Sequence, residues 1–380
     1  MMNRIYLDNA STTALAPEVF QEMTPYFMEC YGNASSVHGT GREAHRALDK
    51  ARKRVAMALG AQPQEIYFTS GGSESDNWAL KGAAMANQER GKHIITSAIE
   101  HHAVLNACHW LEGMGFEVTY LPVDRCGKVD PEAVEQAIRT DTILISLMAA
   151  NNEIGTLQPI AQVGEIARGR GILFHTDAVQ AVGAMPLDVQ ALGVDLLSLS
   201  AHKFHGPKGI GALYIRRGAK VQSLIHGGSQ ERNMRAGTEN LPAIVGLGKA
   251  IELAVQGIPE RAARIAALRD QFILGVQQAI PEAILNGDPK DRLPGNIHFT
   301  FPGVDGEALL LRMDLMGIAC SGGSACTSGS SEPSHVLAAL GQGPLLSRGG
   351  LRITLSDQNT EAELQEALQA LIAIVQDLKS

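Results

Sequence analysis

The sequence predicts an α/β protein with a mostly parallel sheet in a large domain, followed by a smaller α+β domain. Two observations carry this prediction. Short apolar runs typical of buried strands alternate with longer stretches of helical periodicity through most of the chain. From about residue 257 this alternation gives way to a different pattern. We therefore expect a large domain over residues 15–257 and a small domain formed by residues 1–14 and 258–380.

In the large domain, each apolar run is expected to be a strand that leads into a helical pattern. The runs EIYFTS (65–70) and HIITSA (93–98) precede helical patterns over 73–91 and 101–115. TILISLMAA (142–150) precedes a helix that begins near Pro159, and ILFHTDA (172–178) precedes the segment VQAVG. Strands that alternate with helices in this way form parallel sheets with covered faces.

The C-terminal part opens with a long helical segment over residues 259–280. The stretches GNIHFTFPG, EALLLRMDLMG and RITLS follow it, and a helix over residues 360–378 closes the chain. This mixture predicts the smaller α+β domain.

The composition is that of an ordinary globular protein, with 45% hydrophobic and 19% charged residues. A net charge of -8 argues against nucleic acid or an anionic membrane as the main partner. No apolar run reaches transmembrane length, and the N-terminus lacks the apolar stretch of a signal peptide. We expect a soluble cytoplasmic protein.

The five cysteines are scattered and form no C-x-x-C pair, so neither a disulfide framework nor a zinc site is indicated. Cys326 lies in SGGSACTSGSS, a run too small and polar to pack as core, and is a candidate nucleophile. Cys320 has apolar neighbours and is expected to be buried. The other three, Cys30, Cys108 and Cys126, are assigned to structure.

Lys203 is placed unusually for a lysine, at the end of the apolar run LLSLS and among Ser200, His202 and His205. A lysine that forms a Schiff base needs such a setting, because burial favours the neutral, nucleophilic amine. The segment FTSGGSESDN places two glycines and Ser73 where a strand leads into a helix, which suits an anion such as phosphate. The alternative is an ordinary turn with Ser73 as helix cap.

Other polar residues follow further strand ends. Asp177 can keep a heterocyclic nitrogen protonated, and Gln180 can bond the same ring; the alternative for Asp177 is a helix cap. His101 can stack on a planar cofactor, and Asn152 can reach the same cleft. The histidines with Cys108 match no standard zinc spacing, so a metal site is not favoured. Phosphate cradle, stacking imidazole, ring-nitrogen carboxylate and lysine together predict pyridoxal 5′-phosphate.

The sequence resembles the cysteine desulfurases of the NifS/IscS family, which are pyridoxal 5′-phosphate enzymes of the aspartate aminotransferase fold (fold type I, with a seven-stranded sheet). The resemblance runs nearly end to end. Its motifs are YLDNASTT, GNASSVHGTGREA, TSGGSESDN, EHHAVL, NNEIGTLQPI, HTDAVQAVG, SLSAHKFHGPKGIGALYIR, GGSQERNMRAGTEN, CSGGSACTSGSSEPSHVLAALG and LRITLS. Two departures are Ala34 in place of the usual proline and Asp357 in place of a glycine.

The resemblance implies a role for each candidate residue. Lys203 is the Schiff-base lysine, His101 stacks on the ring and assists proton transfer, and Cys326 is the nucleophile that receives sulfur from L-cysteine. The phosphate is held by Gly72, Ser73, Ser200, His202 and, from the neighbouring subunit of a homodimer, Thr238. Asp177 pairs with the ring nitrogen, Gln180 contacts the ring hydroxyl, and Asn33, Asn152 and Arg352 line the substrate pocket.

The implied reaction converts L-cysteine to L-alanine and leaves a persulfide on Cys326 for an iron–sulfur scaffold or another sulfur acceptor. No intrinsic metal is implied, and Cys326 is the point at which a transferred iron–sulfur cluster is expected to make contact. The alternatives are another enzyme of this fold, such as an aminotransferase or selenocysteine lyase, and an inactive sulfur carrier or assembly partner.

Overall fold

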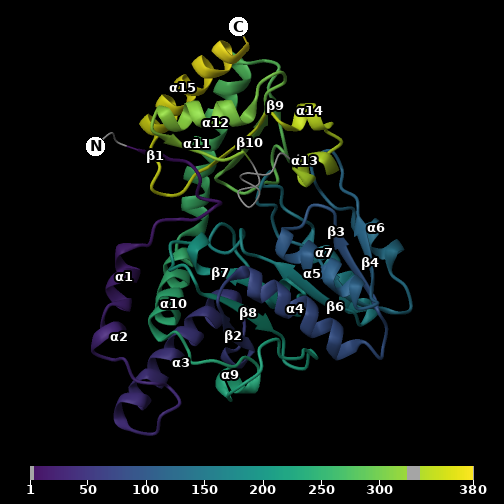
Figure 1. The fold of residues 1–380 in the computed structure, drawn as a ribbon, viewed down its shortest axis with the longest axis vertical. Helices are drawn as coiled ribbons and strands as arrows, with labels where there is room; N and C mark the ends of the chain where they lie inside the picture. The colour runs from purple at the N-terminus through teal and green to yellow at the C-terminus, as the bar shows by residue number, and fades with distance from the viewer. Residues whose placement is uncertain (1–3, 323–333, 380) are drawn as a thin grey trace.

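The computed structural model describes residues 4–322 and 334–379, and its elements form two parts that lie one above the other along the long axis (Figure 1). In the lower part, which is the large domain, hydrophobic clusters on the two faces of the sheet make up the lower core. A separate cluster in the upper part is the upper core. Within the described residues this sheet has seven strands: β2 (Ile66–Thr69), β3 (His93–Ser97), β4 (Glu117–Leu121), β5 (Thr142–Ser146), β6 (Leu173–Asp177), β7 (Leu196–Ser200) and β8 (Gly211–Ile215).

The strand order is β2-β8-β7-β6-β5-β3-β4. β8 alone runs in the direction opposite to the other six strands described in this sheet, so the prediction of a mostly parallel seven-stranded sheet is confirmed. The helices and 3₁₀ turns of this part are α1 (Pro17–Met23), α2 (Pro25–Met28), α3 (Gly39–Leu59), η1 (Pro63–Glu65), α4 (Gly72–Asn87), α5 (His102–Gly113), α6 (Pro131–Ala137), α7 (Ile160–Arg170), α8 (Val189–Leu192), η2 (Ala201–Lys203), α9 (Gln230–Asn233) and α10 (Leu241–Val255).

Alternate residues of each strand face opposite helical layers, as the twofold period of a strand requires. Ile145 and Leu197 enter the core shared with α3, α7 and α10, whereas Leu144 and Leu196 face α4 and α5. Toward the carboxyl ends of the strands, the face that looks at α4 turns from apolar to polar. Ser146, His175, Asp177 and Ser198 continue the α4-facing positions of β5, β6 and β7.

The upper core contains β1 (Ile5–Tyr6), α11 (Ile258–Ala279), β9 (Ile284–Leu285), β10 (Asn296–Thr300), α12 (Gly306–Leu315), β11 (Ile318–Ala319), β12 (Gly350–Thr354) and α15 (Glu361–Lys379). The short helices α13 (His335–Ala339) and α14 (Pro344–Ser347) belong to the same stretch of chain. In the part of the chain that is described, no single helix is long and apolar enough to cross a membrane. The pair α10 and α11 passes that test only jointly, bends by 75° at the break between them, and buries its apolar residues in the two cores.

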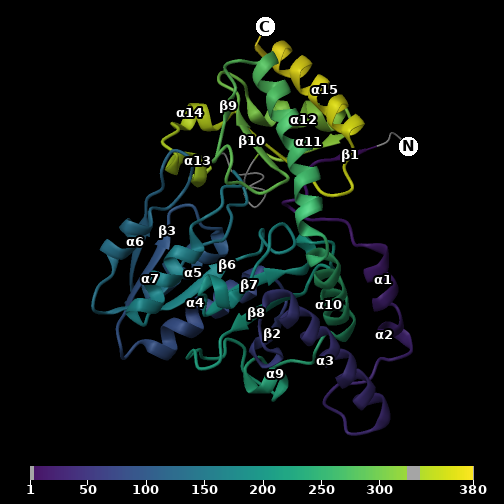
Figure 2. The same ribbon diagram turned by 180° about the vertical axis from the view of Figure 1, so that it is seen from behind.

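The structure differs from the sequence-based expectations at three places. VQAVG is a turn rather than a helix, because the Ala181 and Val182 amides both donate to the Ala178 carbonyl and Gly183, at φ 80°, ends the turn. The helix after β2 begins at Gly72 with Gly71 as its cap, so Ser73 is not the capping residue. The 21-residue helix α3, which packs on α10, was not predicted. Seen from behind, α1 and α2 lie along the outer edge beside α10 and α3 (Figure 2).

Candidate active site

Lys203 lies in η2, immediately after the carboxyl end of β7. Its Nζ donates to the Ala10 carbonyl at 2.5 Å and to the Ser11 carbonyl at 2.9 Å. The predicted site residue Gln180 donates to the same Ala10 carbonyl at 3.0 Å, and His202 Nδ1 lies 3.1 Å from Thr12 Oγ1. The N-terminal segment therefore lies directly against three residues that were predicted to form the site.

Asp177 ends β6, is 6% exposed and accepts a hydrogen bond from the Val179 amide at 2.9 Å. This hydrogen bond closes a local turn and does not cap a helix, so the alternative that Asp177 caps a helix is wrong. Burial raises the pKa of Asp177 to about 6, while the Val179 amide and the Lys203 charge oppose the shift. A cationic partner would stabilise an ionised carboxylate buried at this position.

A second carboxyl group, that of Asp76 in α4, lies behind Asp177. Its Oδ1 is 3.6 Å from Nε2 of His175, which also contacts Ser198 Oγ at 3.0 Å. Burial raises the pKa of Asp76 well above its usual value and the Asp177 charge raises it further, whereas burial lowers the pKa of His175 to about 3. Burial therefore disfavours a charge on both Asp76 and His175.

His101 caps α5, and its Nδ1 accepts a hydrogen bond from the Ala103 amide at 3.1 Å. Burial and the charge of Lys203 lower the pKa of His101 to about 4. The ring is therefore neutral at physiological pH, which suits a group that stacks on an aromatic ring and exchanges protons.

The start of α4 forms a recess with Ser200 of β7. A Cβ added at Gly72 would lie 2.7 Å from Val179 Cγ2 and 3.6 Å from Ser200 Cβ, and one at Gly71 would lie 3.7 Å from Ser200 Oγ. Gly71 has φ 154° and ψ -175°, a conformation reserved for glycine. Gly72 thus lets the start of α4 pack closely against Val179 and Ser200, and the amides and dipole of the helix N-terminus suit an anion such as phosphate.

Arg352 reaches the same region from β12 of the small domain and is 2% exposed. Its Nη1 donates to the main-chain carbonyl of Asn152 at 2.9 Å, and its Nη2 donates to Ser11 Oγ at 2.8 Å. Because Ser11 also binds Lys203 through its carbonyl, one residue connects the arginine with the lysine. The turn that presents Asn152 is held by Asn151, whose side chain bonds Ile99 and the amides of Glu153 and Ile154.

Asn33 and Thr238 are not brought into this cluster. They line a separate cavity of about 250 Å³ together with Tyr26, Tyr31 and Pro242. Thr238 is exposed, and the loop that carries it is fixed by Arg235, whose Nε and Nη2 bind the Glu74 carboxylate at 2.9 and 3.2 Å.

Cys326 lies outside the described residues. Ser334 and His335, the first described residues after it, contact the large domain: Ser334 Oγ donates to Glu153 Oε2 at 2.6 Å, and the rings of His335 and His102 are 4.7 Å apart. Cys108 is buried, as its structural assignment requires, whereas Cys30, Cys126 and Cys320 are partly buried. Burial raises the pKa of the Cys320 thiol to about 12, which makes it a poor nucleophile. Among the described residues no group of His, Cys, Asp and Glu side chains is arranged to hold a metal ion.

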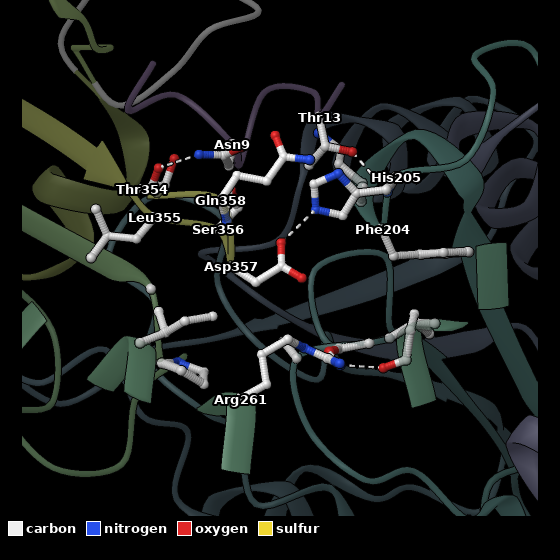
Figure 3. Close-up of a pocket in the computed structure, with 18 of the residues that line it drawn as sticks. Asn9, Thr13, Phe204, His205, Arg261, Thr354, Leu355, Ser356, Asp357 and Gln358 are labelled. Carbon is white, nitrogen blue, oxygen red and sulfur yellow. Dashed lines mark hydrogen bonds and ion pairs between the residues drawn. The ribbon is translucent and has the colours of Figure 1, made fainter. Parts of the chain in front are cut away.

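A larger cavity of about 510 Å³ lies between the two cores, and the predicted site residues Gln180 and Lys203 are among those that line it (Figure 3). Asn9, Thr13 and Ser356 line it, and His205 faces Asp357 across it at 3.5 Å. Residues 8–13 have no individual role among the sequence-based predictions. YLDNASTT was the only available signal, and it did not reveal that Asp8 and Ser11 contact Arg352.

Comparison with known proteins gives one consistent result. The family described as aminotransferase class-V matches residues 5–367. A cysteine desulfurase IscS of Methanosarcina thermophila is 56% identical over 376 residues, covering 99% of this chain and 93% of the relative. One from Dictyoglomus turgidum is 54% identical over 380 residues, covering 100% and 96%.

Solved structures agree with these relatives. A NifS-like protein superimposes with a TM-score of 0.93 at 41% identity, covering 99% of this chain and 100% of that one. A structure described as SspA in complex with cysteine has a TM-score of 0.82 at 39% identity, covering 94% and 100%.

Proposed function

This chain belongs to the aminotransferase class-V family, and we infer from that membership and from its site that it is a cysteine desulfurase dependent on pyridoxal 5′-phosphate. It converts L-cysteine to L-alanine and transfers the sulfur. The observation that carries this inference is the convergence of Lys203 and Arg352 on Ser11, which places an amine and a carboxylate-binding group in one cleft.

The residues present fit the cofactor. The N-terminus of α4 at Gly72 offers main-chain amides to a phosphate, and Ser200 and His202 border the adjacent strand end. Asp177 is a buried carboxylate suited to a protonated ring nitrogen. When bound, pyridoxal 5′-phosphate supplies an aldehyde that condenses with amines and a ring that takes up electrons when a Cα proton leaves.

The protein's own residues then bind substrate and move its protons. Arg352 binds the carboxylate of L-cysteine, because its buried Nε has no acceptor among the described residues and a guanidinium matches a carboxylate. Lys203 Nζ exchanges the Cα proton, assisted by the neutral ring of His101. The ionised carboxylate of Asp177 provides the negative charge that would pair with the ring nitrogen.

We assign the sulfur transfer to Cys326. Its thiolate attacks the substrate sulfur, an S–S bond forms, and the Cβ–S bond breaks. The electron pair of the broken bond stays on Cβ, which is protonated to the methyl group of L-alanine. The sulfur of the persulfide then passes to an iron–sulfur scaffold or another acceptor. Because the reaction needs a reduced thiol at Cys326, we place the enzyme in the reducing environment of the cytoplasm.

We further propose a homodimer with shared sites. Two observations support it. First, Thr238 and Asn33 lie in a cavity that does not include Lys203. Second, the adjoining segment 25–31, called the arm below, has exposed apolar side chains, with Phe27 at 58%, Met28 at 83% and Tyr31 at 73%. An exposed apolar group of this kind marks an interaction surface. A second copy would cover the arm and receive Thr238 at its phosphate recess.

The first experiment is incubation of the purified protein with L-cysteine, followed by quantification of alanine and mass spectrometry of Cys326. We expect alanine in the wild type, a mass gain of one sulfur on Cys326, and loss of both in Cys326→Ala. Cys30→Ala is the matched control and should behave as wild type. A cofactor-loaded protein that makes no alanine contradicts the desulfurase assignment and leaves another enzyme of this family.

A further inference from the structure

The N-terminal segment Asp8–Ser11 contacts the arginine that is assigned to the substrate carboxylate. Nη2 of Arg352 donates to Asp8 Oδ1 at 2.9 Å and to Ser11 Oγ at 2.8 Å. Ser11 Oγ in turn donates to Asp8 Oδ1 at 2.8 Å. The three side chains therefore form a closed triangle of hydrogen bonds around one end of the guanidinium.

These contacts fix which donors of Arg352 are left for a ligand. The Asp8 and Ser11 side chains take the two hydrogens of Nη2, and the Asn152 carbonyl takes one of Nη1. Nε is buried and has no acceptor among the described residues. A buried donor without an acceptor costs free energy of folding. We therefore expect the Nε edge of the guanidinium to be the one that binds a carboxylate.

The segment is attached to the strand that carries Arg352. Asp8 forms a parallel bridge with Thr354, two residues beyond Arg352, and the Ala10 amide donates to Thr354 Oγ1 at 2.8 Å. The Asn9 side chain donates to the Thr354 carbonyl at 2.8 Å. Asp8 and Ser11 are thus held in fixed register with Arg352, as a support for its side chain must be.

We propose that Asp8 and Ser11 are positioning residues that hold the Arg352 guanidinium with Nε directed at the α-carboxylate of the amino-acid substrate. The proposal rests on the carboxylate-binding role given to Arg352 above. Asp8 balances the charge of an arginine that is 2% exposed, and Ser11 prevents its rotation. Preorganisation of this kind strengthens substrate binding, because less side-chain freedom is lost when the substrate arrives.

The opposite role makes the opposite prediction. If the Asp8 carboxylate instead occupied the place of the substrate carboxylate, its removal would improve binding. We expect Asp8→Ala and Ser11→Ala in the cofactor-loaded enzyme to raise KM for L-cysteine, Asp8→Ala by about tenfold or more, with kcat within about threefold of wild type. Asp8→Asn keeps a carbonyl acceptor and should recover part of the loss.

Binding of L-alanine, measured by calorimetry, gives a readout that does not depend on turnover, and it should weaken in parallel with the rise in KM. Asp357→Asn is the matched control, because it makes the same chemical change in a residue that pairs with His205. We expect it to leave KM and kcat unchanged. If Asp8→Ala does not fold, Ser11→Ala decides the question.

The outcomes separate the two proposals. A wild type that makes no alanine overturns the proposed function. An active wild type with an Arg352→Lys variant of normal KM overturns the carboxylate-binding role of Arg352, and with it the positioning role. If the wild type is active and Arg352→Lys raises KM, but Asp8→Ala and Ser11→Ala keep or lower it, only the positioning role is overturned.

Discussion

At the scale of single residues, the site is dominated by carboxyl groups that are buried at a cost in stability. Asp177 is held at a strand end where burial raises its pKa to about 6, and Asp76 behind it has its pKa raised further. Glu100, also fully buried, has its pKa raised to about 8 by burial, despite hydrogen bonds from Ser97 and the Met148 amide. Strongly perturbed acids of this kind concentrate where a protein binds or transforms a ligand.

Replacement of Asp177 by Asn is expected to stabilise the cofactor-free protein at pH 8, on the order of 2 kcal/mol, because the amide has no charge to bury. The folded-state pKa of about 6 lies above the usual 3.8. The wild type therefore loses stability relative to the variant as the pH rises from about 4, and the difference is complete above pH 7.

Urea unfolding at pH 5 and pH 8 measures this, with the exposed Asp314→Asn as control. A wild type that is the more stable protein at pH 8 would contradict the sign, and would mean that Lys203 compensates the charge fully.

The same variant is expected to bind pyridoxal 5′-phosphate with a changed visible spectrum and to make little alanine. Bound pyridoxal 5′-phosphate would place a cationic ring nitrogen beside Asp177 and so lower its pKa from the value of about 6 that burial gives it in the cofactor-free protein. We therefore expect the cofactor-free wild type to bind the cofactor less tightly as the pH falls through about 6, because Asp177 must then lose a proton on binding. Fluorescence titration at pH 5 and pH 8 measures this, and equal affinity at the two pH values would contradict the expectation.

At the scale of elements, the site exists because the start of α4 approaches the carboxyl ends of β6 and β7. Ser198 pairs in register with Asp177, so the polar positions of two parallel strands lie side by side beneath the helix. The packing of α4 is close at Gly72, where the side chain of Val179 leaves no space for a Cβ. Helix, turn and strand ends thus form one anion recess.

Gly72→Ala is expected to lower the affinity for pyridoxal 5′-phosphate at least about tenfold, because the added methyl group clashes with Val179 and moves the start of α4, whose amides bind the phosphate, away from Val179. Fluorescence titration of the cofactor-free protein measures the affinity. Adding Val179→Ala should recover part of it. Gly169→Ala in α7, where nothing lies within 4 Å of the new Cβ, should leave it unchanged. Equal affinity in Gly72→Ala and wild type would place the phosphate elsewhere.

At the scale of the whole molecule, two cores meet at the active site, and each contributes to it. The large domain supplies Lys203, Asp177 and His101, whereas Arg352 comes from the small domain. Segments from the two ends of the chain are joined here, since Asp8 and Arg352 are 344 residues apart. The exposed arm and the remote position of Thr238 suggest that a second copy completes the site.

Subunit mixing tests the shared site. Lys203→Ala should lack activity, and Thr238→Asp should lose most of it, because a carboxylate repels the partner's phosphate. When the two variants are mixed and allowed to exchange subunits, activity should rise above that of either parent, since one of the two sites in a mixed dimer is intact. Lys208→Ala, an exposed neighbour, is the control and should be fully active. No rise after proven exchange would place Thr238 outside the partner's site.

The sequence by itself determined the strands, the residues at their ends and the resemblance that assigned them. These features are local: a strand, its turn and the next helix lie within a few residues, and parallel strands bring their carboxyl ends together in any order. Lys203, Asp177, His101 and Gly72 were therefore all predictable.

Tertiary structure alone decided the remainder. Asp8 and Ser11 acquire their contacts with Arg352 only when the small domain folds around β12, and Asp76 faces His175 only because α4 crosses the sheet at that point. The placement of Thr238 and Asn33 in one separate cavity likewise emerged only from the fold. Contacts between residues far apart in the chain depend on how helices and sheets pack, and local patterns carry no record of that packing.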